Sequence, residues 1–94
     1  MVLIVKFIGS LRHALGAEKL SLDFDGDFSI RELIDKISIE KPEFRQSFIG
    51  GHSDVSTANA LVLVNGKEIS VLNGLETRVK ISDEVVFVPV AHGG

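Results

Sequence analysis

The sequence predicts one α+β domain in which one main helix crosses over a mixed β-sheet. Three observations support this fold class. The chain of 94 residues has room for one hydrophobic core, and 45% of its residues are hydrophobic. Only one stretch has an apolar repeat of helical period, and several short β-branched runs lie between turn residues. The predicted order is strand, strand, helix, strand, strand, strand.

The first two strands are expected to form a hairpin. Val2 to Ile8 is apolar apart from Lys6, which is typical of a central strand buried on both faces. Ala17 to Phe24 alternates between apolar and polar side chains, as a half-buried edge strand does. The stretch from Leu11 to Gly16 is predicted to be the turn between them.

A helix is predicted to begin after Ser29. Ser29 lies three residues before Glu32, which is the spacing of a capping box, in which each side chain bonds to the other residue's backbone amide. Pro42 is expected to end the helix near Glu40, because proline disfavours helical geometry in the residue before it. The face expected to be buried carries an apolar stripe made of Ile30, Leu33, Ile34 and Ile37.

A long connection is expected after the helix. Glu43 to Asn59 has no clear period and is rich in turn-forming residues. Phe44, Phe48 and Ile49 are expected to attach this connection to the core. Its Gly50-Gly51 pair is interpreted as a loop turn.

The strongest local signal is a second hairpin. Leu61 to Val64 and Lys67 to Val71 flank the pair Asn65-Gly66. Asn-Gly is favoured in two-residue turns in which both φ angles are positive. Asn73-Gly74 is expected to end the second of these strands.

The last strand is predicted to run from Glu84 to Val88, after a segment that crosses to a turn at Ile81 to Asp83. Pro89 has no amide hydrogen for sheet pairing, so regular pairing is expected to end there. The sequence therefore predicts a folded domain over residues 1–89 and a flexible C-terminal tail over residues 90–94.

The first and last strands are both apolar on two faces, which predicts that they lie side by side while the helix crosses one face of the sheet. This is the β-grasp arrangement. One short helix covers only one face, so some apolar sheet surface is expected to remain bare. The alternative is that the connection from Glu43 to Asn59 folds over that surface.

Composition argues against several classes of function. The chain has 13 acidic and 10 basic residues, and the basic ones are scattered, which disfavours nucleic acid as a partner. The absence of cysteine excludes disulfides, thiolate metal sites and nucleophilic thiols. The histidines have no further ligands at useful spacing, so no metal site is predicted. No segment fits a signal peptide or a membrane-spanning helix, and the expected location is the cytoplasm.

The most informative feature for function is the terminal pair Gly93-Gly94. Glycine has no Cβ, so two glycines can lie extended in a slot too narrow for other residues. The carboxylate of Gly94 is therefore expected to be open to a reagent. The chain carries no recognisable set of nucleophile, base and orienting residue, so chemistry done on this chain is favoured over chemistry done by it.

Three segments together carry a resemblance to a known family. They are Leu-Val-Asn-Gly at 63–66, Asp-Glu-Val-Val-Phe-Val-Pro at 83–89, and Gly93-Gly94. In combination they resemble the ubiquitin-like sulfur-carrier family. That family includes the small subunit of molybdopterin synthase, the thiamine-pathway sulfur carrier and the ubiquitin-related modifier of tRNA thiolation. The likeness is densest over residues 60–94, and the first half agrees mainly in the order of its elements.

The resemblance implies a protein cosubstrate or non-catalytic subunit rather than an enzyme. In the family, an activating enzyme joins the terminal carboxylate to the α-phosphate of ATP, and the acyl-adenylate then becomes a thiocarboxylate that donates sulfur. Carried over, Gly94 is the reacting residue, and Val90, Ala91, His92 and Gly93 thread into the partner. ATP belongs to the activating enzyme, and no cofactor is expected on this chain.

Two partners are implied by the resemblance: an adenylating enzyme of the ubiquitin-activating type, and a sulfur acceptor such as the large subunit of molybdopterin synthase. A few apolar side chains carry most of the energy in such an interface. The candidates for docking are Leu61, Leu63, Val85 and Phe87, provided that their face of the sheet is the bare one. The alternative is that they belong to the ordinary core.

The ending of the chain is mixed between branches of the family. Pro89-Val90 resembles the molybdopterin and thiamine branches, whereas His92-Gly93-Gly94 resembles the ubiquitin-related modifier. Ile81-Ser82-Asp83-Glu84 stands where molybdopterin-type members usually have Asp-Gly-Asp-Glu. Molybdopterin biosynthesis is the favoured pathway. The alternatives are a protein modifier, a tRNA-thiolation carrier and a non-covalent β-grasp interaction module.

Overall fold

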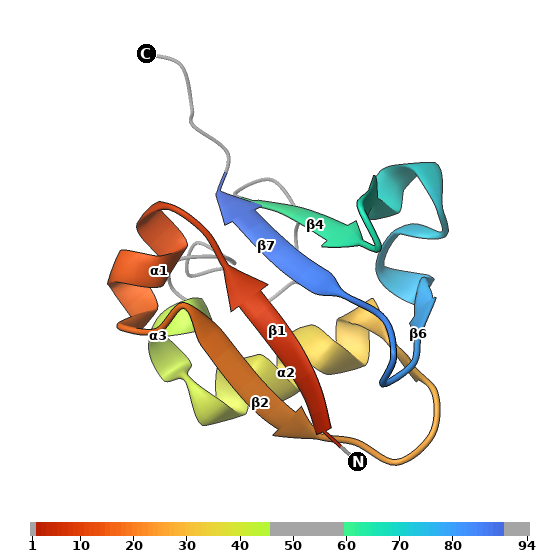
Figure 1. Ribbon diagram of the computed structural model, residues 1–94, viewed down its shortest axis with the longest axis horizontal. Coiled ribbons are helices and arrows are strands. Elements are labelled where there is room, and N and C mark those ends of the chain that lie inside the picture. The colour runs from red at the N-terminus through yellow and green to blue at the C-terminus, as the bar shows by residue number, and fades with distance from the viewer. Residues whose placement is uncertain (1, 46–59, 90–94) are drawn as a thin grey trace.

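The computed structural model describes residues 2–45 and 60–89 (Figure 1). Within these residues, five strands form one mixed sheet in the order β2-β1-β7-β4-β5. Their bounds are β1 Val2–Phe7, β2 Lys19–Asp23, β4 Ala60–Val64, β5 Lys67–Glu68 and β7 Val85–Pro89. The same residues form a smaller sheet of two strands, β3 Phe28–Ser29 and β6 Arg78–Val79. The helices and helical turns are α1 Ser10–Leu15, α2 Ile30–Glu40, α3 Pro42–Phe44, η2 Ile69–Val71 and η3 Gly74–Glu76.

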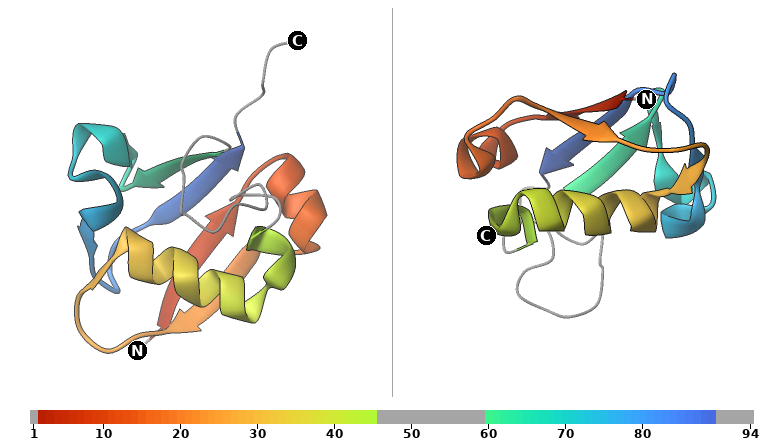
Figure 2. Two further views of the ribbon diagram at one scale, coloured as in Figure 1. Left: turned by 180° about the vertical axis from the view of Figure 1, so that it is seen from behind. Right: turned by 90° about the horizontal axis from the view of Figure 1, so that it is seen from below.

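The centre of the sheet is the parallel pair β1 and β7, which confirms that the first and last strands lie side by side. Phe7 lies opposite Phe87, and Val5 lies opposite Val85. β2 runs antiparallel to β1 as an edge strand, and β4 runs antiparallel to β7 on its other side. α2 crosses one face of this sheet, so the topology is the predicted β-grasp arrangement (Figure 2).

Helix α2 has the predicted bounds and the predicted cap. The Ser29 amide donates to Oε1 of Glu32 at 3.0 Å, and the Glu32 amide donates to Oγ of Ser29 at 3.1 Å. The helix ends at Glu40, one residue before Lys41 and two before Pro42. The side chains of its apolar stripe are fully buried: Ile30, Leu33, Ile34 and Ile37.

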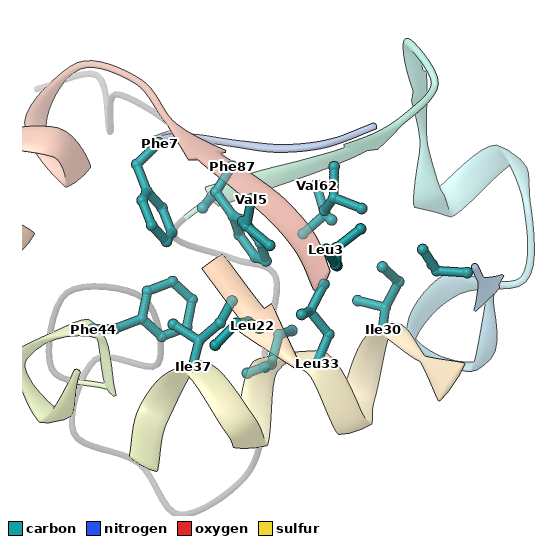
Figure 3. Packing of buried hydrophobic residues seen from close by; sticks show 14 of the residues in the cluster. Leu3, Val5, Phe7, Leu22, Ile30, Leu33, Ile37, Phe44, Val62 and Phe87 are labelled. Atoms are coloured by element: carbon teal, nitrogen blue, oxygen red, sulfur yellow. The ribbon is translucent and has the colours of Figure 1, made fainter. Parts of the chain in front are cut away.

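The core lies between α2 and the sheet face above it (Figure 3). Three phenylalanines meet at one end of it. The ring of Phe87 is 5.8 Å from that of Phe7 and 5.4 Å from that of Phe44, which meets it edge to face. Phe44 therefore attaches the start of the long connection to the core, as predicted, whereas Phe48, Ile49 and the Gly50-Gly51 pair lie outside the described residues.

The turn expected between the first two strands is instead the short helix α1. Leu11 and Leu15 are four residues apart, so they lie on one face of this helix, and both are buried. Gly16 ends the helix in the left-handed conformation with φ 66°. The interpretation of this stretch as a simple turn was wrong because the burial of these two leucines stabilises a helix.

The second hairpin turns as predicted, with Asn65 at φ 52° and Gly66 at φ 84°. Its returning strand is shorter than predicted, because β5 stops at Glu68 and Ile69–Val71 forms a helical turn. Pairing between β3 and β6 was not predicted. Phe28 lies opposite Val79 there, and both side chains are buried in the core.

Candidate functional site

The candidate site begins where β7 ends. Pro89 is the last residue of β7, and it lies opposite Ala60 at the start of β4. Because β7 is flanked by β1 and β4, the chain leaves the sheet at its centre rather than at an edge (Figure 1). Gly94, the predicted reacting residue, and Val90, Ala91, His92 and Gly93, the predicted threading segment, lie outside the described residues.

The sheet face away from α2 carries exposed apolar side chains. Val2 is 54% exposed, Ile4 48%, Ile8 49% and Leu61 41%. No helix of the described residues covers this face (Figure 2, right). As predicted, apolar sheet surface is thus left uncovered by the helices of residues 2–45 and 60–89. The alternative, that the connection from Glu43 to Asn59 covers it, falls mainly outside the described residues.

Strand register decides which residues share this open face. Leu61 lies opposite Val88, and Leu63 lies opposite Val86, so all four belong to the same face. Leu61 is exposed, and Leu63 and Val88 are partly exposed. We call the open face the surface formed by Val2, Ile4, Ile8, Leu61, Leu63, Val86 and Val88.

Two of the four docking candidates lie on the open face and two do not. Leu61 and Leu63 are on it, but Val85 and Phe87 are fully buried beneath the sheet. These two pair with Val64 and Val62, whose side chains also face the core. Their assignment to a docking surface was wrong, because successive residues of a strand point to opposite faces.

Sequence reasoning did not name the other five residues of the open face as docking candidates: Val2, Ile4, Ile8, Val86 and Val88. They could have been found by assigning alternate residues of each strand to opposite faces and then pairing all strands in one consistent register.

One ion pair lies in the same region, between Nζ of Lys6 and Oε2 of Glu84 at 3.6 Å. Both side chains are well exposed, so the pair adds little stability.

At the other end of β7, a hydrogen-bond network joins two turns. Nδ2 of Asn65 donates to Oδ1 of Asp83 at 3.0 Å, and the Glu84 amide donates to Oδ1 of Asn65 at 2.9 Å. The Lys80 amide donates to Oδ2 of Asp83 at 2.9 Å. The turn whose sequence departs from the molybdopterin-type pattern is thus held by the Asn65 side chain of the β4–β5 hairpin and by its own Lys80–Asp83 hydrogen bond.

Asp83 is expected to make stability depend on pH. Burial raises the pKa of its carboxyl, but the hydrogen bonds from Asn65 and the Lys80 amide and the Lys80 charge lower it more, so the pKa lies below its ordinary value. A carboxyl whose pKa is lower in the folded than in the unfolded state stabilises the fold at pH values above its unfolded-state pKa, which is near 3.9. This stabilisation is lost as the pH falls through the folded-state pKa. Asp83→Asn should therefore flatten the loss of unfolding free energy below about pH 4.

Urea unfolding followed at a series of acidic pH values measures this slope. Asp25→Asn is the matched control, because Asp25 is an exposed aspartate in the connection between β2 and β3. Equal slopes for the wild-type chain and Asp83→Asn would show that the Asn65–Asp83 network contributes nothing to acid stability.

Comparison with known proteins places the chain in a family. The model of the ThiS family matches residues 5–94. The chain belongs to the ThiS family. It is 33% identical over 99 residues to ubiquitin-related modifier 1 of Schizosaccharomyces pombe, and the match covers 100% of both proteins.

Solved structures share the fold of this ThiS-family chain. The crystal structure of SAMP1 from Haloferax volcanii superposes with a TM-score of 0.83 at 21% identity, covering 100% of both chains. A chain of the BexX/CysO complex from Amycolatopsis orientalis has a TM-score of 0.72 at 25% identity, over 98% of this chain and 99% of that one. The predicted β-grasp fold and the resemblance to ubiquitin-like sulfur carriers are confirmed.

Two other features were sought in vain in the described part of this ThiS-family chain: a metal-binding cluster and a membrane-spanning helix. Residues 2–45 and 60–89 hold no group of three or more His, Cys, Asp or Glu side chains that could bind a metal ion. None of the helices in these two ranges is long and apolar enough to cross a bilayer.

Proposed function

We propose that this chain is a sulfur carrier whose Gly94 carboxylate is adenylated by an ATP-dependent activating enzyme and then converted to a thiocarboxylate. The observation that carries the proposal is the ThiS-family match, which runs through residue 94 and so includes Gly93-Gly94. The exit of the chain from the centre of the sheet, beside an apolar face, supports it further.

The chemistry requires activation before sulfur can be accepted. A C-terminal carboxylate has a pKa of about 3.3 to 3.7, so it is ionised near neutral pH and resists attack by a nucleophile. Its oxygen attacks the α-phosphorus of ATP, and pyrophosphate leaves. A sulfur donor at the oxidation level of hydrosulfide then attacks the acyl carbon, AMP leaves, and loss of the S–H proton gives the thiocarboxylate.

This chain contributes positioning rather than catalytic groups. The open face gives the activating enzyme an apolar surface, and Leu61 and Val88 lie on it next to the end of β7. A partner that buries these side chains also brings the residues after Pro89 to its own reaction centre. The fold relative from Amycolatopsis orientalis belongs to a BexX/CysO complex, which supports the expectation that such a carrier works with a partner protein.

The sulfur acceptor we propose first is a molybdopterin precursor, bound by an acceptor enzyme such as a molybdopterin synthase large subunit. This pathway follows from the resemblance of Pro89-Val90 to that branch, and it stays a prediction. A second candidate is a protein modifier or a carrier for tRNA thiolation. It is favoured by the full-length match at 33% identity to a ubiquitin-related modifier.

Intact-mass analysis of the protein purified from its native host tests the proposal. An exchange of oxygen for sulfur on the last peptide supports a sulfur carrier, and attachment to lysines of other proteins favours the modifier. ATP–pyrophosphate exchange with the cognate activating enzyme measures the first step. A chain that is unmodified in the host and gives no exchange would be a non-covalent interaction module, and the proposal would be wrong.

Leu61→Asp is expected to weaken docking without unfolding the chain. A charge at an apolar anchor of an interface costs about 2 kcal/mol or more, which corresponds to roughly a 30-fold rise in KM for the carrier in the exchange reaction. Ile39→Asp is the matched control, because Ile39 is 79% exposed on α2, away from the open face. Equal KM values for the two variants would remove Leu61 from the docking surface.

A further inference from the structure

Two lysines lie directly opposite each other on the side of the sheet away from α2. Lys6 of β1 is paired with Lys19 of the edge strand β2, and directly opposed residues of an antiparallel pair point to the same face. Lys6 also lies opposite Val86 of β7, and Val86 lies opposite Leu63 of β4. The two lysines therefore form one end of a row that continues into the apolar residues of the open face.

The charges of this lysine pair are incompletely balanced. Like charges directly opposite each other destabilise a sheet. Nζ of Lys6 lies 3.6 Å from Oε2 of Glu84, and no ion pair within residues 2–45 and 60–89 includes Lys19. Edge strands carry lysine to prevent pairing with other chains, which accounts for Lys19 but not for Lys6, because β1 is a central strand. The pair thus keeps a positive charge that the described part of the fold does not use.

Both lysines line an open hollow of about 310 Å³ on this side of the sheet. Its lining residues are Val2, Ile4, Lys6, Lys19, Ile81, Asp83 and Glu84. Both oxygens of Asp83 already accept hydrogen bonds, from Asn65 and from the Lys80 amide. Apolar walls beside an unbalanced ammonium group suit a carboxylate on a short aliphatic stem, as in aspartate or glutamate. A phosphate is less suited, because two carboxylates of the chain line the same hollow.

We propose that the open face selects a partner protein that presents an aspartate or glutamate, whose carboxylate pairs with Lys19 and Lys6. The inference rests on the proposed function, in which this partner is the activating enzyme. The lysines share a row with Val86 and Leu63, so the carboxylate and the apolar contacts belong to one interface. A charge at the rim of an interface acts mainly on the association rate and its salt dependence. The lysine pair therefore guides and selects the partner, and the apolar residues hold it.

Lys19→Glu is expected to slow association with the cognate activating enzyme about tenfold at low ionic strength, as measured by stopped flow. About 1 M salt should reduce the difference to less than about twofold, because the Debye length falls to about 3 Å. Lys67→Glu is the matched control with the same change in net charge. Lys67 is also an exposed strand lysine, but it lies opposite the buried Val64 and so on the other side of the sheet. Equal association rates for the two variants would overturn the inference.

The stability of Lys19→Glu separates a binding role from damage to the fold. The variant replaces a like-charge pair across β1 and β2 by an opposite-charge pair, so its urea midpoint should be at or above the wild-type value. Slower association together with undiminished stability is the result expected of a binding residue. A lower midpoint would contradict the repulsion between Lys6 and Lys19 and would overturn the inference.

Glu84→Gln is expected to act in the opposite direction. Removing the charge of Glu84 frees Lys6 for the partner's carboxylate, so association should become about twofold faster or more at low ionic strength. Glu43→Gln is the matched control, because Glu43 is an exposed glutamate on α3. Association of Glu84→Gln no faster than that of Glu43→Gln would show that Glu84 does not compete with the partner, which overturns the proposed pairing with Lys6.

Cross-linking identifies the carboxylate itself. A carbodiimide activates a carboxylate, the amine of a contacting lysine attacks the acyl carbon, and a urea leaves as the amide forms. In the complex of the wild-type chain with the activating enzyme, mass spectrometry should find Lys19 or Lys6 joined to an aspartate or glutamate of the enzyme. Replacing that residue by lysine should restore fast association to Lys19→Glu. A complex without this cross-link, or a charge exchange that restores nothing, would overturn the inference.

The same experiments separate this inference from the proposed function. A wild-type chain that neither binds the activating enzyme nor supports ATP–pyrophosphate exchange contradicts the proposed function, and the inference is overturned with it. A wild-type chain that binds and supports exchange, while Lys19→Glu associates as fast as Lys67→Glu, overturns the role of the lysine pair alone.

Discussion

Adding one residue after Gly94 is expected to abolish activation of the chain, with a loss of at least about 100-fold in ATP–pyrophosphate exchange. The added residue moves the carboxylate about 3.3 to 3.6 Å along the chain and places an amide where the reacting oxygen should be. Misplacing a reacting group by about 1 Å already costs about 100-fold. No change elsewhere in the chain removes the reacting group so directly.

Binding and activation should separate in this extended chain. The open face is unaltered, so the affinity for the activating enzyme, measured by calorimetry with inactive enzyme, should stay close to the wild-type value. Leu61→Asp should behave in the opposite way, because it keeps the carboxylate and loses the docking contact. Activation of the extended chain at the wild-type rate, with intact mass showing the extra residue still present, would show that Gly94 is not the residue that reacts.

Elements that depend on residues close together in the sequence could be predicted from the sequence alone. The capping box of Ser29 and Glu32 lies within four residues, and the stripe on α2 within eight, so the sequence contains both in full. The turn at Asn65-Gly66 likewise depends on the φ preferences of two neighbours. The central position of β1 and β7 followed from their apolar composition.

Features that depend on distant partners were not predictable in this way. β3 and β6 are two residues long, and they pair where Phe28 and Val79, which are distant in the sequence, are buried side by side. α1 depends on the burial of two leucines beneath the rest of the fold. The faces of Val85 and Phe87 depend on register with β4, and a shift of one residue reverses every side chain of a strand. Half of the predicted docking surface was wrong for this reason.

The terminal diglycine and the open face carry different kinds of information. Gly93-Gly94 is visible in the sequence because only its position and residue type matter. The open face becomes visible when β1, β7 and β4 are paired, because Ile4, Val88 and Leu61 come from these three strands. The pairing of Lys6 with Lys19 depends on the register of β1 with β2, and neither segment alone predicts it.

Phe87→Ala is expected to lower the free energy of unfolding by about 3 to 5 kcal/mol. The Phe87 side chain is fully buried, and its ring contacts those of Phe7 and Phe44. Alanine leaves a cavity beside the rings of Phe7 in β1 and Phe44 in α3, and a core cavity that does not collapse adds to the cost of the lost ring. Since small domains have about 5 to 15 kcal/mol in total, this change removes a large share of the stability.

Phe24→Ala is the matched control, because it removes the same ring from a partly exposed position, where Phe24 stacks on Phe28 at 3.9 Å. Its loss should be clearly smaller, and urea unfolding measures both. A loss below about 1 kcal/mol for Phe87→Ala would contradict its place in the core and reopen its assignment to the docking surface. Because β7 joins the core to the end of the chain, only the folded fraction of Phe87→Ala should be activated. KM should stay unchanged when it is calculated from the concentration of folded chain.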